Sequence, residues 1–400
     1  CWTVGQYDGG GGTYHNLVEH GVGDTWSIEP SPNTSDALSN GLNGVTCFDT
    51  GECWAVGYSY TGVSSDFQTL IEHRVNGTWS IVATPNPSTA TESFLYGVAC
   101  PTVNVCWAVG WDSNAVQQTV IEEYSGGVWS IVNSPNPVSE SSFLYGVACQ
   151  SPTSCWASGW FEGGTAGGAL NGVGETLIEH YDGTAWSIVQ SANPGSGSSG
   201  FQNNWLFGIT CQTGGSCWSV GWYANNSPAQ SLIETNASGT WAAVSAPNEP
   251  DPGTSDELAS VACSSTSCYA VGDYYDKAAQ DYKTIIEETD GNSWYLVPSE
   301  NITDPASNTA FTAVACSALD ACRAVGYDYA SSACSGSFCV PYNRTLIEDN
   351  SAPASALPEA PLGPLAVAGM GIGVASLAMA RRRRSSRQSA ASSASSSEPA

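Results

Sequence analysis

The feature that most constrains the fold is a phrase of about 50 residues that the chain repeats. "FLYGVACQSPTSCWASGW" (Phe143–Trp160) nearly reproduces "FLYGVACPTVNVCWAVGW" (Phe94–Trp111). A tryptophan near the end of each unit recurs at steps of about 50 to 57 residues: Trp26, Trp79, Trp129, Trp186, Trp241 and Trp294. A fixed repeat of this length is typical of solenoids, propellers and arrays.

Each unit contains four strand-like runs. In one copy they are "LYGVA", "CWASGW", "TLIEHY" and "WSIVQS", which are rich in β-branched and aromatic residues and separated by Gly, Asn, Ser and Pro. Four short strands per unit predict an all-β chain folded as a β-propeller. A β-helix would need a much shorter period, and separate sandwich domains would need about 100 residues each.

The number of repeats predicts seven blades of four antiparallel strands, with the first and last incomplete. One glycine and one glutamate each recur seven times: Gly5, Gly57, Gly110, Gly159, Gly221, Gly272 and Gly326, and Glu19, Glu72, Glu122, Glu179, Glu234, Glu287 and Glu348. The propeller is expected over residues 1–350, with repeats at about 1–33, 34–87, 88–137, 138–194, 195–250, 251–301 and 302–350. We expect an upstream segment to supply the missing first strand and a partner for Cys1.

The turn before the repeated tryptophan carries a family resemblance. "YDGTAW" (Tyr181–Trp186) and "TDGNSW" (Thr289–Trp294) place an Asp-Gly turn between the third and fourth strands. The repeats resemble the kelch and Asp-box class of propeller repeats, over residues 1 to about 350. The resemblance implies the propeller architecture, and no sialidase activity is carried over from it.

The fifteen cysteines favour disulfides over metal binding. Zinc sites use C-x2-C pairs with further Cys or His nearby, whereas this chain has mostly C-x5-C spacing and four histidines. Cysteines across a short turn predict local disulfides and an oxidising compartment. The predicted pairs are Cys47/Cys53, Cys100/Cys106, Cys149/Cys155, Cys211/Cys217, Cys263/Cys268, Cys316/Cys322 and Cys334/Cys339, which leaves Cys1 alone.

The charge balance excludes nucleic acid as a partner. The chain has 37 acidic and 10 basic residues, and five of the basic residues lie in the tail, at Arg381–Arg384 and Arg387. The strongly acidic remainder repels nucleic acid and anionic lipid surfaces.

The C-terminal region predicts a surface anchor. We expect a Pro/Ala linker at 351–361, a transmembrane helix at 362–380 and a basic, then Ser-rich, cytoplasmic tail at 381–400. The linker contains "LPEAP" (Leu357, Pro358, Glu359, Ala360, Pro361). It resembles bacterial LPxTG and PEP-type sorting signals, with Ala360 and Pro361 replacing Thr and Gly. The alternative is a plain single-pass anchor. Either holds the propeller on the extracellular face of the membrane.

Candidate ligand-binding residues lie where the variable connections between second and third strands begin. They are Tyr58, Trp111, Asp112, Trp160, Trp222, Asp273, Tyr274, Tyr327 and Asp328. Aromatic rings stack on sugar faces, and nearby aspartates accept hydroxyl hydrogens or hold Ca²⁺. The alternative is that these rings pack between blades. No cofactor is predicted apart from Ca²⁺. The acidic clusters do not have the fixed ligand spacing of a Ca²⁺-binding loop, so the sequence gives Ca²⁺ little support.

Three functions remain open from the sequence. The first is a binding or adhesion module for an extracellular glycan or protein. The second is a secreted polysaccharide-active hydrolase or lyase, and the third is a structural surface protein. No Ser-His-Asp set, P-loop or HExxH motif is present, so the sequence favours a non-enzymatic role. We expect the repeated glutamates to accept hydrogen bonds from a neighbouring blade, and the alternative is an acidic ring that binds metal.

Overall fold

The computed structural model is all-β in the part of the chain that it describes. No helix in that part is long and apolar enough to cross a membrane. The predicted span at 362–380 and the "LPEAP" motif lie outside the described residues. The described residues are 1–23, 25–63, 66–87, 90–114, 116–137, 141–163, 173–195, 202–212, 215–225, 228–250, 253–265, 267–299, 307–317, 321–335 and 338–349, without the side chains of 114, 307 and 329–344.

The strands fall into seven consecutive antiparallel groups within the described residues. Groups 1 and 7 have three strands: β1 (Trp2–Gly10), β2 (Thr13–Val22) and β3 (Thr25–Glu29), and β24 (Ser307–Cys316), β25 (Cys322–Ser335) and β26 (Phe338–Asp349).

Groups 2 to 6 have four strands each. Groups 2 and 3 form one eight-stranded sheet, joined by a single parallel pairing of Phe67 with Glu92. The bounds are β4 (Asn40–Cys47), β5 (Cys53–Tyr60), β6 (Phe67–Val75), β7 (Thr78–Val82); β8 (Glu92–Thr102), β9 (Val105–Asn114), β10 (Val116–Ser125), β11 (Val128–Val132); β12 (Ser142–Ser151), β13 (Ser154–Gly163), β14 (Val173–Tyr181), β15 (Trp186–Val189); β16 (Gln202–Cys211), β17 (Cys217–Asn225), β18 (Gln230–Thr235), β19 (Ala242–Val244); and β20 (Ser255–Cys263), β21 (Cys268–Asp276), β22 (Asp281–Thr289), β23 (Trp294–Leu296).

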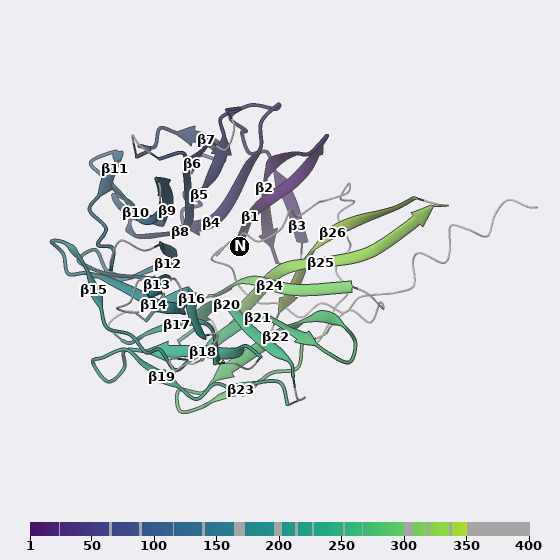
Figure 1. The fold of residues 1–400 in the computed structure, drawn as a ribbon. Coiled ribbons are helices and arrows are strands. Elements are labelled where there is room, and N and C mark those ends of the chain that lie inside the picture. The colour runs from purple at the N-terminus through teal and green to yellow at the C-terminus, as the bar shows by residue number, and fades with distance from the viewer. Residues whose placement is uncertain are drawn as a thin grey trace, which may run out of the picture.

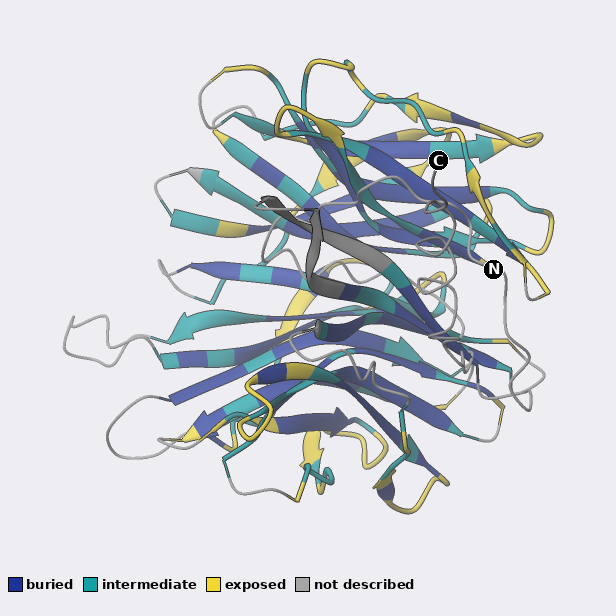
Figure 2. Cartoon of the chain, turned by 90° about the vertical axis from the view of Figure 1, so that its right-hand side faces the viewer, coloured by how far each residue is buried: buried dark blue, intermediate teal, exposed yellow. Residues whose placement is uncertain are grey.

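The groups follow one another around a common centre (Figure 1). Group 7 packs on group 1 as well as on group 6. One apolar cluster joins Trp2 and Val18 of group 1 to Ala313, Val325 and Ile347 of group 7. Buried residues run along the strands, and exposed residues gather at their ends and in the connections (Figure 2). The core therefore lies between neighbouring sheets, as in a propeller.

In groups 2 to 7 the repeated glycine lies opposite a bulge of the innermost strand. In group 3 the pairing of β8 with β9 shifts between Leu95 and Gly97, which pushes the carbonyl of Phe94 toward Gly110. A Cβ atom on Gly110 would lie 1.8 Å from that oxygen. Glycine is required here because any side chain would collide with backbone.

Six of the predicted disulfides are confirmed, each between the first and second cysteine of one repeat. Every pair joins two adjacent strands across their turn, as predicted: Cys47–Cys53, Cys100–Cys106, Cys149–Cys155, Cys211–Cys217, Cys263–Cys268 and Cys316–Cys322. Cys334 and Cys339 face each other in the register of β25 and β26, but their side chains lie outside the described residues. Cys1 is exposed and forms no disulfide with a described cysteine.

Candidate functional site

The candidate site lies at the ends of the second strands, opposite the disulfide turns. In groups 2 to 7 the residue after the repeated glycine faces one residue of the first strand of its group. In groups 2 to 7 these pairs are Tyr58 with Gly41, Trp111 with Phe94, Trp160 with Phe143, Trp222 with Trp205, Asp273 with Glu257, and Tyr327 with Ala310. Because the register is the same in every group, these pairs lie at one level of the molecule.

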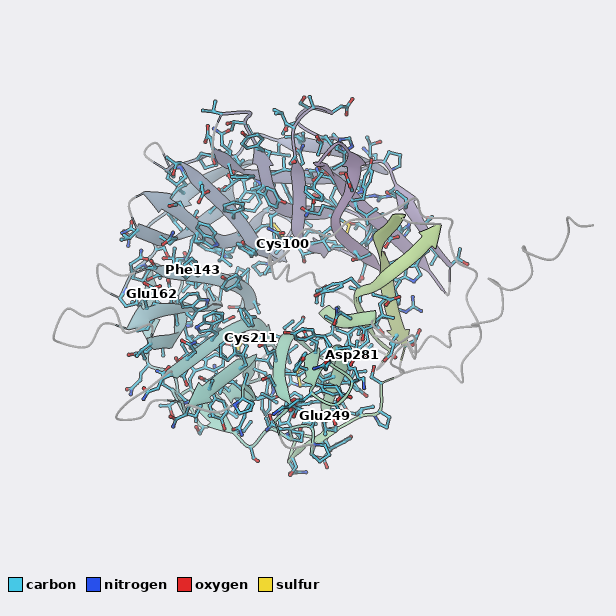
Figure 3. The ribbon with its side chains drawn as sticks, turned by 45° about the vertical axis from the view of Figure 1, so that its right-hand side comes forward. Cys100, Phe143, Glu162, Cys211, Glu249 and Asp281 are labelled. Atoms are coloured by element: carbon cyan, nitrogen blue, oxygen red, sulfur yellow. A yellow bond between two sulfur atoms is a disulfide. The ribbon has the colours of Figure 1, made fainter. Side chains whose placement is uncertain are left out.

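Seven of these rings form one continuous aromatic arc across groups 2 to 5: Tyr58, Phe94, Trp111, Phe143, Trp160, Trp205 and Trp222. Successive ring centroids lie 5.2, 4.8, 5.5, 4.4, 4.5 and 4.7 Å apart. Alternate contacts cross from one group to the next. Phe143, part of this arc, is labelled in Figure 3.

The aromatic arc packs the sheets together and still presents ring surface to solvent. Trp160 stacks on Trp205 of the next group with an interplanar angle of 11°. Six of the seven rings are half-buried, and Trp222 is 8% exposed. The predicted ligand-binding rings therefore do pack between groups, and all but Trp222 also retain accessible surface.

Beyond Trp222 the same two positions become acidic. Glu257 and Asp273 face each other on β20 and β21, and both are half-buried. Burial raises the pKa of Asp273 to about 8, and the neighbouring Glu257 carboxyl adds to this shift. Burial also raises the pKa of Glu257. Asp273 therefore keeps its proton near neutral pH, and its carboxyl group can donate a hydrogen bond.

Two tyrosines adjoin the acid pair. Burial raises the pKa of Tyr327 to about 12, and the charge of Asp273 contributes. Tyr282 is 45% exposed, and its pKa is also raised, by burial and by both acids. Glu257 and Tyr282 were missed from the sequence. The available signal for Glu257 was its place in the repeat, where other units have Phe94, Phe143 and Trp205.

Three of the predicted residues lie on the other face of their strands. Asp112, Tyr274 and Asp328 come one position later than the arc residues, so the alternation of side chains along a strand turns them away. They face Ser93, Asp256 and Thr309, which are all buried. The structure therefore does not bring these three residues together with the arc.

The environment of these three residues is polar and enclosed. Burial raises the pKa of Asp112 to about 6. Asp328 is buried. Burial and the surrounding carboxyl groups raise the pKa of Tyr274 to about 12. Asp256 accepts a hydrogen bond from the backbone N–H of Glu249 at 2.7 Å, so it orders the preceding connection.

Metal ligands do not converge in the described part of the chain. No group of three or more His, Cys, Asp or Glu side chains there could hold a metal ion. Asp276, at the end of β21, pairs with Lys283. The repeated glutamates lie apart from one another, each at an interface between two groups.

Comparison with known proteins defines the fold class. No family profile and no curated protein matches the sequence. Among solved structures, the chain is similar to an ulvan lyase from a new family of polysaccharide lyases, with a TM-score of 0.50 and 10% identity over 81% of this chain and 87% of that one. This likeness establishes a shared propeller-type β fold.

Two further structures are similar over less of the chain. The α-L-arabinanase of Penicillium chrysogenum complexed with arabinobiose has a TM-score of 0.40 and 10% identity, over 69% of this chain and 85% of that one. "YCF48 bound to D1 peptide" has a TM-score of 0.35 and 15% identity, over 61% of this chain. The match spans 65% of that protein's length.

Proposed function

We propose that the chain is a seven-bladed, extracellular β-propeller that binds an uncharged glycan along its aromatic arc. The seven strand groups are its blades, and the packing of group 7 on group 1 closes the ring. The observation that carries the proposal is the row of half-buried rings from Tyr58 to Trp205 on the face with the variable connections. Sugar rings present C–H faces to aromatic rings, and a row of rings suits a chain of sugars.

The charge of the protein selects among glycans. With a formal net charge of −27, the chain repels uronate-bearing and sulfated polysaccharides. Neutral polysaccharides carry no such penalty. The solved neighbours supply two probes with different charge. Arabinobiose is neutral, whereas the ulvan unit -[GlcA(1-4)Rha3S]- is anionic. We therefore expect a neutral arabinan to bind better than ulvan at low ionic strength.

Calorimetric titration of the protein with neutral polysaccharides tests the proposal. Trp160→Ala removes the ring that stacks on both Phe143 and Trp205, so binding should weaken at least about tenfold, which corresponds to about 1.4 kcal/mol. Trp26→Ala is the matched control, because Trp26 is also half-buried but lies on β3, outside the arc. Equal loss in both variants, or no binding to any neutral or anionic polysaccharide, would contradict the proposal.

A second function is favoured by the acid pair. Glu257 and Asp273 face each other at the end of the arc, and glycoside hydrolysis uses two carboxyl groups, one protonated and one ionised. The alternative is therefore a polysaccharide-active enzyme with its reactive end in group 6. Release of reducing ends from a bound polysaccharide, abolished by Asp273→Asn while binding persists, would establish it. Binding without product release would leave the non-enzymatic module.

The location is part of the proposal. We propose that the propeller lies outside the cell and is held by the span at 362–380, with Arg381–Arg384 inside. The six hairpin disulfides support an oxidising compartment. The Arg cluster directly after the apolar stretch supports this orientation. The "LPEAP" motif is proposed as a surface-sorting signal of the LPxTG or PEP type.

A further inference from the structure

The repeated glutamates are buried at the interfaces between neighbouring groups. In groups 2 to 7 the glutamate lies on the third strand, and Glu72, Glu122, Glu179, Glu234 and Glu348 each accept a hydrogen bond from the preceding group. Five of the repeated glutamates are fully buried, and we call these the latch glutamates: Glu72, Glu122, Glu179, Glu234 and Glu287. A side chain that is repeated at every interface acts on the whole ring rather than on one site.

Hydroxyl groups connect each carboxyl group to the preceding group. Between groups 2 and 3, Thr69 Oγ1 lies 3.1 Å from Thr84 Oγ1, which donates to Glu122 Oε2 at 2.6 Å. Between groups 3 and 4, Thr119 Oγ1 lies 2.6 Å from Ser134 Oγ, which in turn donates to Glu179 at 3.2 Å. The connection between two sheets therefore supplies the donor, and the next sheet supplies the acid.

The same arrangement recurs elsewhere with small changes. Glu72 accepts from Ser31 Oγ at 2.8 Å and from Asn16 Nδ2 at 2.7 Å. Glu234 accepts from the backbone N–H of Ala192 at 3.2 Å, and its other oxygen has no partner among the described residues. The donors at these four interfaces, to Glu72, Glu122, Glu179 and Glu234, are therefore all neutral groups.

No cation faces the latch glutamates in the described structure. The surrounding polar groups are hydroxyls, an amide and backbone N–H, and the one charged side chain that influences any of the five is Asp256, near Glu287. A buried carboxylate without a cation loses solvation and gains no ion pair, so the neutral acid is favoured. Burial raises the pKa of Glu72 and Glu122 to about 7, and that of Glu179, Glu234 and Glu287 to about 8.

We infer that the latch glutamates make the ring pH-sensitive: in protonated form they hold adjacent groups together, and their ionisation weakens the five interfaces between groups 1 and 6 at once. The folded pKa of each group is above its unfolded value of 4.5, so the folded ring binds more protons than the unfolded chain. The contribution of these groups to the free energy of unfolding is therefore largest below about pH 4.5. It falls as the pH rises from there to about 8.

The interface between groups 5 and 6 differs from the others in lacking the hydroxyl residue of the connection. Ala246 occupies the place of the hydroxyl residue that is Thr84 or Ser134 at other interfaces. Among the five connections that precede the latch glutamates, the one before Glu287 therefore has no hydroxyl side chain at this place. Ala246→Ser should restore that donor, lower the pKa of Glu287 and stabilise the ring above pH 8.

Proton counting on the whole protein tests the inference without any variant. Potentiometric titration of the native and the urea-unfolded chain gives the difference in bound protons at each pH. At pH 6 the latch glutamates should account for about five protons bound by the native state alone. Equal proton binding by the two states between pH 5 and 8 would overturn the inference.

The variant Glu122→Gln tests whether a latch glutamate causes the pH dependence of stability. Glutamine keeps an acceptor for Thr84 and cannot ionise, so this variant should bind about one proton fewer at pH 6. Its Tm should lie above that of the wild type at pH 9 by a few degrees, and near it at pH 5. Glu123→Gln is the matched control, because Glu123 is the next residue on the same strand and is half-buried. If the Tm of Glu122→Gln changes with pH in the same way as that of the wild type, the inference is overturned. If this variant does not fold, the proton count on the wild-type protein decides alone.

Discussion

At the scale of single residues, Arg323 shows how one substitution in a repeat can serve the closure of the ring. The six other repeats have Trp or Tyr after the second cysteine, whereas group 7 has Arg323. Its guanidinium group pairs with Asp349 at 3.1 Å, and its Nη1 donates to the carbonyl of Gly23 in group 1 at 2.7 Å. The side chain thus links the last group to the first.

Replacing Arg323 by Met should destabilise the folded ring by about 2–3 kcal/mol, because Asp349 is buried and would lose its ion pair. Methionine keeps most of the apolar stem, so the change isolates the charged contacts. Urea denaturation followed by tryptophan fluorescence measures the loss. Lys283→Met is the control, because Lys283 forms its ion pairs with Asp276 and Asp281 inside group 6, away from the contact between groups 7 and 1. An unchanged urea midpoint for the Arg323 variant would refute the role in closure.

At the scale of strands, local features were predictable and contacts between sheets were not. The four runs per repeat and the hairpin disulfides follow from composition and from cysteine spacing, which act within about ten residues. The sequence prediction did not separate the two faces of the second strand. Trp111 and Asp112 were grouped together, although side chains alternate and only Trp111 joins the arc.

The latch and Glu257 could not be derived from one strand at a time. Thr84 and Glu122 are 38 residues apart in sequence, and their contact depends on how groups 2 and 3 pack. The repeats do contain one signal, since a hydroxyl residue recurs five positions after the repeated tryptophan, as at Thr84 and Ser134. Its meaning emerges only when the next sheet places a carboxyl group beside it.

The bulge geometry gives a prediction that compares two copies of one strand position. Gly110→Ala should destabilise the protein by about 2–4 kcal/mol, because the new Cβ would lie 1.8 Å from the backbone oxygen of Phe94. Gly5→Ala is the matched control at the equivalent position of group 1. There a Cβ would meet no described atom within 4 Å. Thermal unfolding monitored by circular dichroism should show a lower Tm for the first variant only. Equal tolerance of both changes would mean that the bulge relaxes freely.

At the scale of the whole molecule, charge and burial act in the same direction. The chain has a sequence pI of about 4.1, so surface repulsion between carboxylates grows with pH just as the latch glutamates ionise. Salt separates the two effects. Added NaCl screens exposed charges and leaves buried groups nearly unaffected. The pH dependence of the free energy of unfolding that remains at high salt is therefore due to the latch glutamates.

The proposed anchor gives the last prediction. The full chain should fractionate with membrane or wall, because the stretch at 362–380 is just long enough to span about 30 Å of hydrocarbon. A chain ending at Ser355 should be released as soluble protein. Gly371→Arg should also release the chain while keeping its length, since Arg at a helix centre costs about 2.5–3.5 kcal/mol. If the full chain and the shortened chain both remain soluble, residues 362–380 are no anchor.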